Sequence, residues 1–150
     1  MVKCDDKEFH NTDVEYELYL NISDKIRTLK FYNINFKTNS SLYIFGSITN
    51  IEFHNYTVES NMLLYIYAKT HLLKFYDTYF ETHSSMLING NAYLIEFHNV
   101  SLKSNTSMDI SYKCNSLKFY DSTIEANASL KLIFPRLNPS RNTRRMRPKN

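Results

Sequence analysis

Glutamate and histidine recur two residues apart at three places in the chain: Glu8 and His10, Glu52 and His54, Glu96 and His98. These side chains can act as general acid and base, or can bind a metal ion. Catalysis requires one pair that differs from the others, yet the three pairs are near-identical and 44 residues apart. The regular spacing therefore favours a structural role, and we expect no catalytic residue, metal or cofactor here.

Two further residue pairs have the chemistry for a site. Glu59 and Glu81 are 22 residues apart, and paired carboxylates ~5–9.5 Å from each other can hydrolyse glycosides. They keep a carbohydrate-active enzyme, or its remnant, open as an alternative. Cys4 and Cys114 are far apart and lack metal-ligand spacing, so we expect neither a disulfide framework nor a zinc site.

A repeat of 22 residues must position all of these side chains. Phenylalanine marks its six periods, at Phe9, Phe31, Phe53, Phe75, Phe97 and Phe119. Two residues after each phenylalanine stands Asn or Asp, which favours a corner. We expect six periods without an insertion, so that Leu20 and Ile22 align with Leu42 and Ile44.

Apolar residues alternate with polar ones inside each period, which is the periodicity of β-strands with one buried face. Three short strands separated by Asn- and Ser-rich corners describe one turn of a parallel β-solenoid, whose turns stack into a continuous core. The sequence therefore predicts an all-β parallel β-helix of about six turns over residues 1–134.

The repeated pattern Leu-x-Ile, a corner, Ile-x-Phe-x-Asn-x-x-Phe/Val and Asn-Ser resembles the right-handed parallel β-helix repeats of pectin-lyase-like proteins. The resemblance covers residues 7–134 and implies, for enzymes of this fold, clustered outward carboxylates, often with arginine or calcium. Here such carboxylates are charge-matched or scattered, and Arg27 is the only arginine before residue 135. A leucine-rich-repeat-like solenoid is the alternative fold, because Ile26-x-x-Leu29-x-Phe31 fits that frame although its Asn column comes one place early.

The residues that flank the phenylalanine column alternate from period to period. On one side Glu alternates with Lys, and on the other His alternates with Tyr. Equivalent residues of stacked turns lie ~4.8 Å apart, so alternating charge converts repulsion into pairing. We interpret the alternation as a stacking rule between neighbouring turns.

Aromatic and apolar residues occupy outward positions of the Leu-x-Ile strand in the middle turns: Tyr43, Phe45, Leu63, Tyr65, Tyr67 and Leu87. Exposed apolar patches often mark binding sites, and tyrosine suits contacts with sugars and proteins. We expect a non-catalytic structural or binding module that presents this patch to a glycan or protein partner. Two other interpretations stay open: tyrosines simply tolerated on a β surface, or a patch covered by the C-terminal tail.

Residues 135–150 form a tail of different chemistry, with six basic residues and no acid, whereas residues 1–134 carry a net charge of −3. We expect the tail to be disordered. Five of its arginines could contact phosphates and make this a nucleic-acid-associated protein: Arg136, Arg141, Arg144, Arg145 and Arg147.

Both ends of the chain bear on localisation and assembly. No apolar run reaches the ~18 residues of a membrane span, and the charged N-terminus shows no signal peptide, which leaves the compartment open. About six residues precede the first turn, too few for the polar cap that solenoids need. We therefore expect end-to-end self-association, or a longer solenoid.

Overall fold

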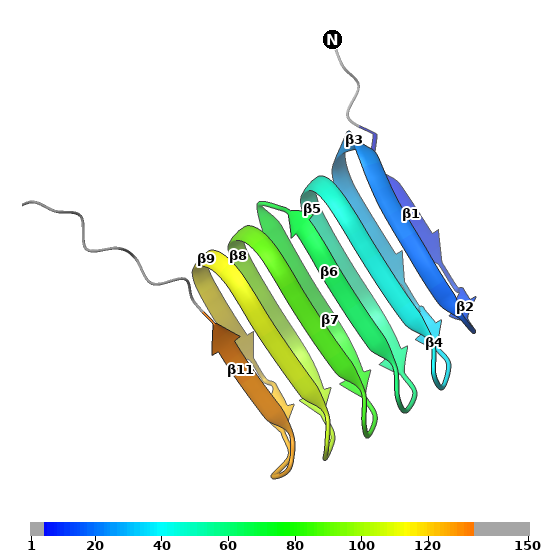
Figure 1. Cartoon of the computed structure of the whole chain (residues 1–150), viewed down its shortest axis with the longest axis vertical. Helices are drawn as coiled ribbons and strands as arrows, with labels where there is room; N and C mark the ends of the chain where they lie inside the picture. The colour runs from blue at the N-terminus through cyan, green and yellow to red at the C-terminus, as the bar shows by residue number, and fades with distance from the viewer. Residues whose placement is uncertain (1–4, 134–150) are drawn as a thin grey trace, which may run out of the picture.

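The computed structural model of the chain describes residues 5–133, which form a coil of parallel strands (Figure 1). Within this part of the chain there is no helix, and so none long and apolar enough to cross a membrane. The strands are β1 (Lys7–His10), β2 (Asp13–Val14), β3 (Glu17–Tyr32), β4 (Asn35–Phe36), β5 (Ser41–Val58), β6 (Leu63–Lys69), β7 (Leu72–Phe80), β8 (Ser85–Leu102), β9 (Ser107–Tyr120), β10 (Thr123–Ile124) and β11 (Ser129–Ile133).

Each turn contributes stretches to three faces. Face A consists of residues 17–22, 41–47, 63–69, 85–91, 107–113 and 129–133. Face B consists of residues 7–10, 28–32, 50–54, 72–76, 94–98 and 116–120. Face C consists of residues 13–14, 35–36, 56–58, 78–80, 100–102 and 123–124.

All pairings are parallel, and most join residues 22 apart, such as Phe9 with Phe31. The predicted all-β solenoid of about six turns is confirmed. Its strands are fewer and longer than three short ones per turn, because β3, β5, β8 and β9 continue through the bend between faces A and B. The strands on all three faces, without a helix in residues 5–133, distinguish this fold from the leucine-rich-repeat alternative.

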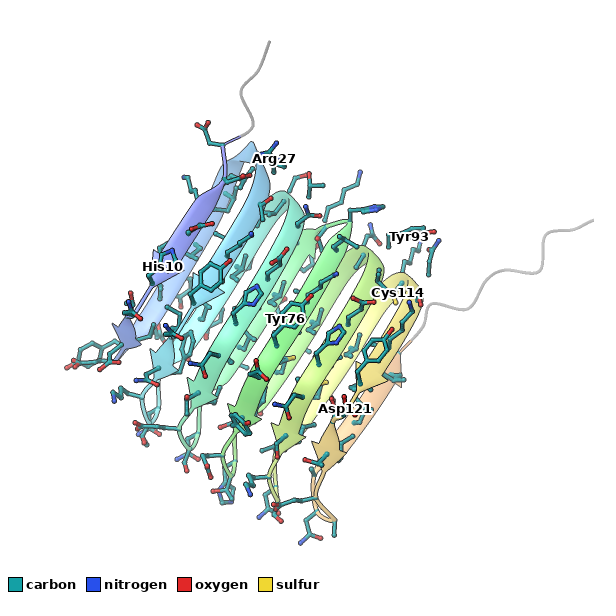
Figure 2. All side chains as sticks on the ribbon, turned by 180° about the vertical axis from the view of Figure 1, so that it is seen from behind. His10, Arg27, Tyr76, Tyr93, Cys114 and Asp121 are labelled. Carbon is teal, nitrogen blue, oxygen red and sulfur yellow. The ribbon has the colours of Figure 1, made fainter. Side chains whose placement is uncertain are left out.

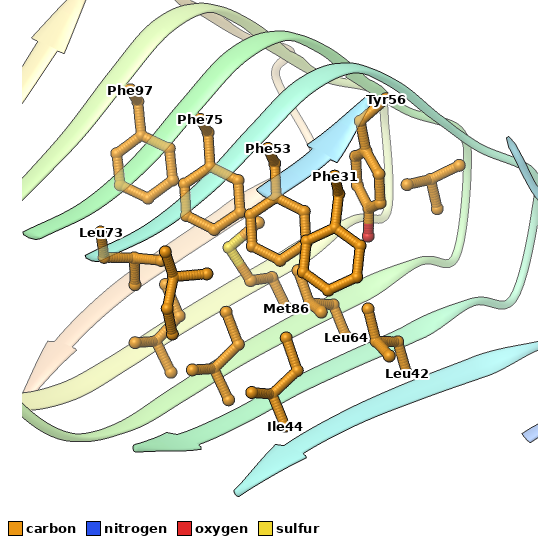
Figure 3. Packing of buried hydrophobic residues seen from close by; sticks show 14 of the residues in the cluster. Phe31, Leu42, Ile44, Phe53, Tyr56, Leu64, Leu73, Phe75, Met86 and Phe97 are labelled. Carbon is orange, nitrogen blue, oxygen red and sulfur yellow. The ribbon is translucent and has the colours of Figure 1, made fainter. Parts of the chain in front are cut away.

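The phenylalanine column runs through the core as a ladder (Figure 3). Phe31, Phe53, Phe75 and Phe97 stack with ring centroids 4.7–4.9 Å apart and planes within 6° of parallel. Buried aliphatic residues of face A pack opposite them: Leu42, Ile44, Leu64, Ile66, Met86 and Ile88. The predicted columns are therefore ladders of like residues that share one dry interior.

Asparagine and aspartate turn the chain from face B to face C. Their backbone φ angles lie between 47° and 53°, a left-handed conformation that Asn and Asp tolerate better than other residues with side chains. Their side chains bond along the stack: Asn33 donates to Asn11 at 2.9 Å and Asn55 donates to Asn33 at 2.7 Å. Asn99 likewise donates to Asp77 at 2.8 Å.

The expectation of six periods without an insertion is wrong in the first turn. Elsewhere a four-residue corner joins faces C and A, as at residues 37–40, where the Ser40 amide donates to the Lys37 carbonyl. The first turn has only residues 15–16 at this corner, and a bulge between Ile22 and Ile26 restores the register. Leu20 consequently pairs with Ile44 rather than Leu42.

Candidate binding face

The six aromatic and apolar residues expected to form a patch lie together on the outer side of face A. Tyr43 pairs with Tyr65, and Tyr65 pairs with Leu87, while Phe45 pairs with Tyr67 and Leu63 lies on the same strand as Tyr65. Tyr67 is 53% exposed, and the other five are partly exposed. We call these residues the aromatic patch.

Tyr19 extends the aromatic patch by one turn, and the repeat alignment missed it. The register shift of the first turn places Tyr19, not Asn21, beside Tyr43. The two rings stack with centroids 4.5 Å apart and planes 4° from parallel, and the Tyr19 hydroxyl donates to Glu17. That hydrogen bond raises the pKa of Tyr19. The missing Asn-Ser corner after Val14 was the available signal in the sequence.

Ring orientation decides which aromatic surfaces a ligand can reach. Tyr19 and Tyr43 cover each other's faces, whereas Tyr65 stands at 62° to Tyr43 with centroids 6.0 Å apart. Tyr67 has no ring-to-ring contact within residues 5–133. Tyr19 and Tyr43 therefore each have one ring face covered by the other, whereas the Tyr67 ring is not covered by another ring of residues 5–133.

A shallow hollow borders the open ring of Tyr67. It borders the column of face A that holds Gly46, Ala68 and Gly90. Its lining combines apolar residues with the polar side chains of Asn21, Lys69 and Asn91. The full lining is Asn21, Phe45, Gly46, Tyr67, Ala68, Lys69, Gly90 and Asn91. The aromatic residues Phe45 and Tyr67 thus share this hollow with the polar residues Asn21, Lys69 and Asn91.

Face B carries the alternating charges and rings on its outer side (Figure 2). His10, Tyr32, His54, Tyr76, His98 and Tyr120 form a continuous stack with ring centroids 4.4–4.8 Å apart. Beside it, Glu96 contacts Lys74 at 3.2 Å, Lys118 at 3.7 Å and His98 at 3.4 Å. The Glu and His pairs are parts of one grid, as the stacking rule predicts.

Glu96 should link the stability of the fold to pH. Burial alone would raise the pKa of this carboxyl, but hydrogen bonds from Lys74 and His98 outweigh it and the pKa lies below 4.5. A lowered pKa stabilises the folded state above the unfolded-state pKa, and this contribution is lost as pH falls through the folded-state value.

We expect Glu96→Gln to reduce stability at pH 6 by about 1–3 kcal/mol and to flatten the loss of stability below pH 4.5. Urea unfolding between pH 3 and pH 7 measures both effects, with the exposed Glu81→Gln as the matched control. An unchanged acid limb in Glu96→Gln would contradict this assignment.

Of the carboxylate pair Glu59 and Glu81, Glu59 is already bonded to the corner of the preceding turn. The Glu59 carboxylate accepts hydrogen bonds from the Thr38 amide and hydroxyl, both at 3.0 Å, and lies 3.4 Å from the Lys37 ammonium. The Thr38 bonds lower the pKa of Glu59, which disfavours a role as general acid. Glu125 makes the same bonds to Ser104, so this arrangement belongs to the corner.

Residues 5–133 contain no group of three or more His, Cys, Asp and Glu side chains that could hold a metal ion. Cys114 is a free thiol whose pKa is raised by burial. The tail arginines, Arg136, Arg141, Arg144, Arg145 and Arg147, lie outside the described residues, as does Cys4.

Comparison with known proteins finds no family model that matches the chain, and no matching curated protein or solved structure.

Proposed function

We propose that the protein is a non-catalytic binding module whose face A binds an extended glycan. The observation that carries this proposal is the open ring of Tyr67, 53% exposed, beside a hollow edged by Asn21, Lys69 and Asn91.

The chemistry of this place suits a sugar. The apolar side of a pyranose ring stacks on an aromatic ring, while amide and ammonium groups bond the hydroxyls around its rim. The hollow is shallow, and its lining runs from the first to the fourth turn of face A. A chain of sugars lying along the face makes more contacts there than a single small molecule, which favours a polymer.

The alternative of a carbohydrate-active enzyme has less support in the geometry. It rests on Glu59 and Glu81, and the Glu59 carboxylate is already bonded to the corner of the preceding turn. A protein partner for the aromatic patch is the second candidate, since exposed tyrosines also suit protein interfaces. The experiment below separates it from a glycan.

Tyr67→Ser is expected to weaken glycan binding about tenfold or more, because it removes the stacking surface. An array of immobilised polysaccharides probed with wild type and variant measures the change. Tyr79→Ser is the matched control, since Tyr79 is 44% exposed on face C and should bind like wild type. Equal binding by Tyr67→Ser and wild type would overturn the proposal, and capture of proteins without any glycan would favour the protein partner.

A further inference from the structure

The C-terminal end of the described solenoid exposes the side chains that form the core elsewhere. Phe119 is 38% exposed, Ile124 46% and Leu132 40%. Their partners one turn earlier, Phe97, Leu102 and Ile110, are 0–2% exposed. The surface at this end is thus core that lacks a following turn, and its strands pair on one side only within residues 5–133.

The N-terminal end also lacks a neighbouring turn within residues 5–133. On face B it begins with β1, and on face A with residues 17–22 of β3, and among residues 5–133 each of them pairs only with the following turn. Phe9, Leu18 and Leu20 pack against the core but are only partly buried. A small apolar hollow lined by Phe9, Val14 and Leu18 lies beside them.

The alternation of Glu with Lys and of His with Tyr on face B predicts which residues a turn stacked on the C-terminal end should present. Inside the chain, a turn with Lys is followed by a turn with Glu: Lys30 contacts Glu52 at 4.0 Å, and Lys74 contacts Glu96 at 3.2 Å. The last turn presents Lys118, Phe119 and Tyr120, so the next should present Glu, Phe and His. The first turn of the chain presents Glu8, Phe9 and His10.

The other two faces agree with that register. On face C, Ile124 would cover Val14 of a second copy, both being apolar and inward at their position. On face A, Leu130 and Leu132 would cover Leu18 and Leu20 of the second copy, as Leu18 and Leu20 themselves pair with Leu42 and Ile44. Apolar side chains therefore meet apolar side chains on all three sides of the core.

Within residues 5–133, the path of the chain covers neither end of the solenoid. The described chain enters face B at Lys7, opposite Leu29, and leaves face A at Ile133, opposite Ser111. Both places lie at the bend between faces A and B, and no strand of residues 5–133 crosses either end (Figure 1).

From these matches we propose that copies of this chain stack head to tail in register, with the C-terminal turn of one on the N-terminal turn of the next. Lys118 then pairs with Glu8 of the second copy, Phe119 stacks on its Phe9, and Tyr120 stacks on its His10. Because this contact joins two different surfaces and continues the axis of the solenoid, it does not close and produces an open fibre. Contact between the C-terminal turns of two copies would instead bring Lys118 against another Lys118.

Disulfide trapping tests the register directly. Thr123 and Asp13 are exposed on face C, and the proposed stacking pairs Thr123 with Asp13 of the next copy. Paired residues of parallel strands lie ~4.8 Å apart, which a disulfide can span. In a full-length background carrying Cys4→Ser and Cys114→Ser, Thr123→Cys and Asp13→Cys are prepared separately, mixed and oxidised.

We expect a covalent heterodimer in the mixture and no covalent dimer of either variant alone. Thr123→Cys mixed with Glu15→Cys, two residues out of register, is the matched control and should give little product. Light scattering of the wild type should show a mass that rises with concentration. A covalent homodimer of Thr123→Cys, or a monomer at every concentration with no cross-link, would overturn the proposal. Cross-linking that needs removal of residues 134–150 would also overturn it, because those residues would then cover the end of the intact chain.

Discussion

Phe75→Ala is expected to lower the free energy of unfolding by about 3–5 kcal/mol. The Phe75 ring is fully buried and lies between Phe53 and Phe97, with centroids 4.8 and 4.9 Å away. Its removal leaves a gap in a ladder whose neighbours are fixed by the strand pairing of adjacent turns, so the core has little freedom to collapse around it. Urea unfolding followed by far-ultraviolet circular dichroism measures the loss.

Phe45→Ala is the matched control for this ladder. It makes the same chemical change on the outer side of face A, where Phe45 is partly exposed and contacts Tyr65 with ring centroids 5.8 Å apart. We expect it to cost about 1 kcal/mol. Equal losses for the two variants would show that the phenylalanine ladder is not the main source of stability.

Gly46→Ala is expected to destabilise the fold by about 3 kcal/mol or more. Gly46 has φ of 130°, a conformation that residues with a side chain rarely adopt. A Cβ atom there would lie 2.3 Å from the carbonyl oxygen of Ile22, and that oxygen belongs to the backbone beside the first-turn bulge. The clash can be relieved only by moving a strand.

Thermal unfolding of Gly46→Ala beside Ser47→Ala measures this effect. Ser47 is the next residue of β5 and is exposed, so its replacement should change stability by at most about 0.5 kcal/mol. A Gly46→Ala variant that melts with the control would mean that face A accommodates a side chain in this column.

The architecture could be predicted because it depends on single columns of the repeat. Phenylalanine at every 22nd residue specifies the core ladder, and Asn or Asp two residues later specifies a corner with positive φ. The bulge between Ile22 and Ile26 could not be predicted in this way. The bulge adds the residues that the short corner at 15–16 lacks, so Phe9 and Phe31 are still 22 residues apart and the sequence spacing reveals neither feature.

The candidate site was predictable to a lesser degree. Strand alternation alone places the aromatic patch on the outer side of face A, but it does not give the orientation of Tyr65 or the partner of Tyr19. The hollow beside Tyr67 is lined by residues of four successive turns, and no single column of the repeat predicts it. The basic tail lies outside the described residues, so its predicted contacts remain predictions.

The nearly uniform 22-residue offset between paired residues has a consequence for how the chain folds. Each turn closes a loop of about the same length, so chain entropy gives no turn an advantage as the place where folding begins. Local packing must decide instead, and the turns that contain Phe53 and Phe75 have complete neighbours on both sides. Folding should start there and proceed outward turn by turn, in the manner of a zipper.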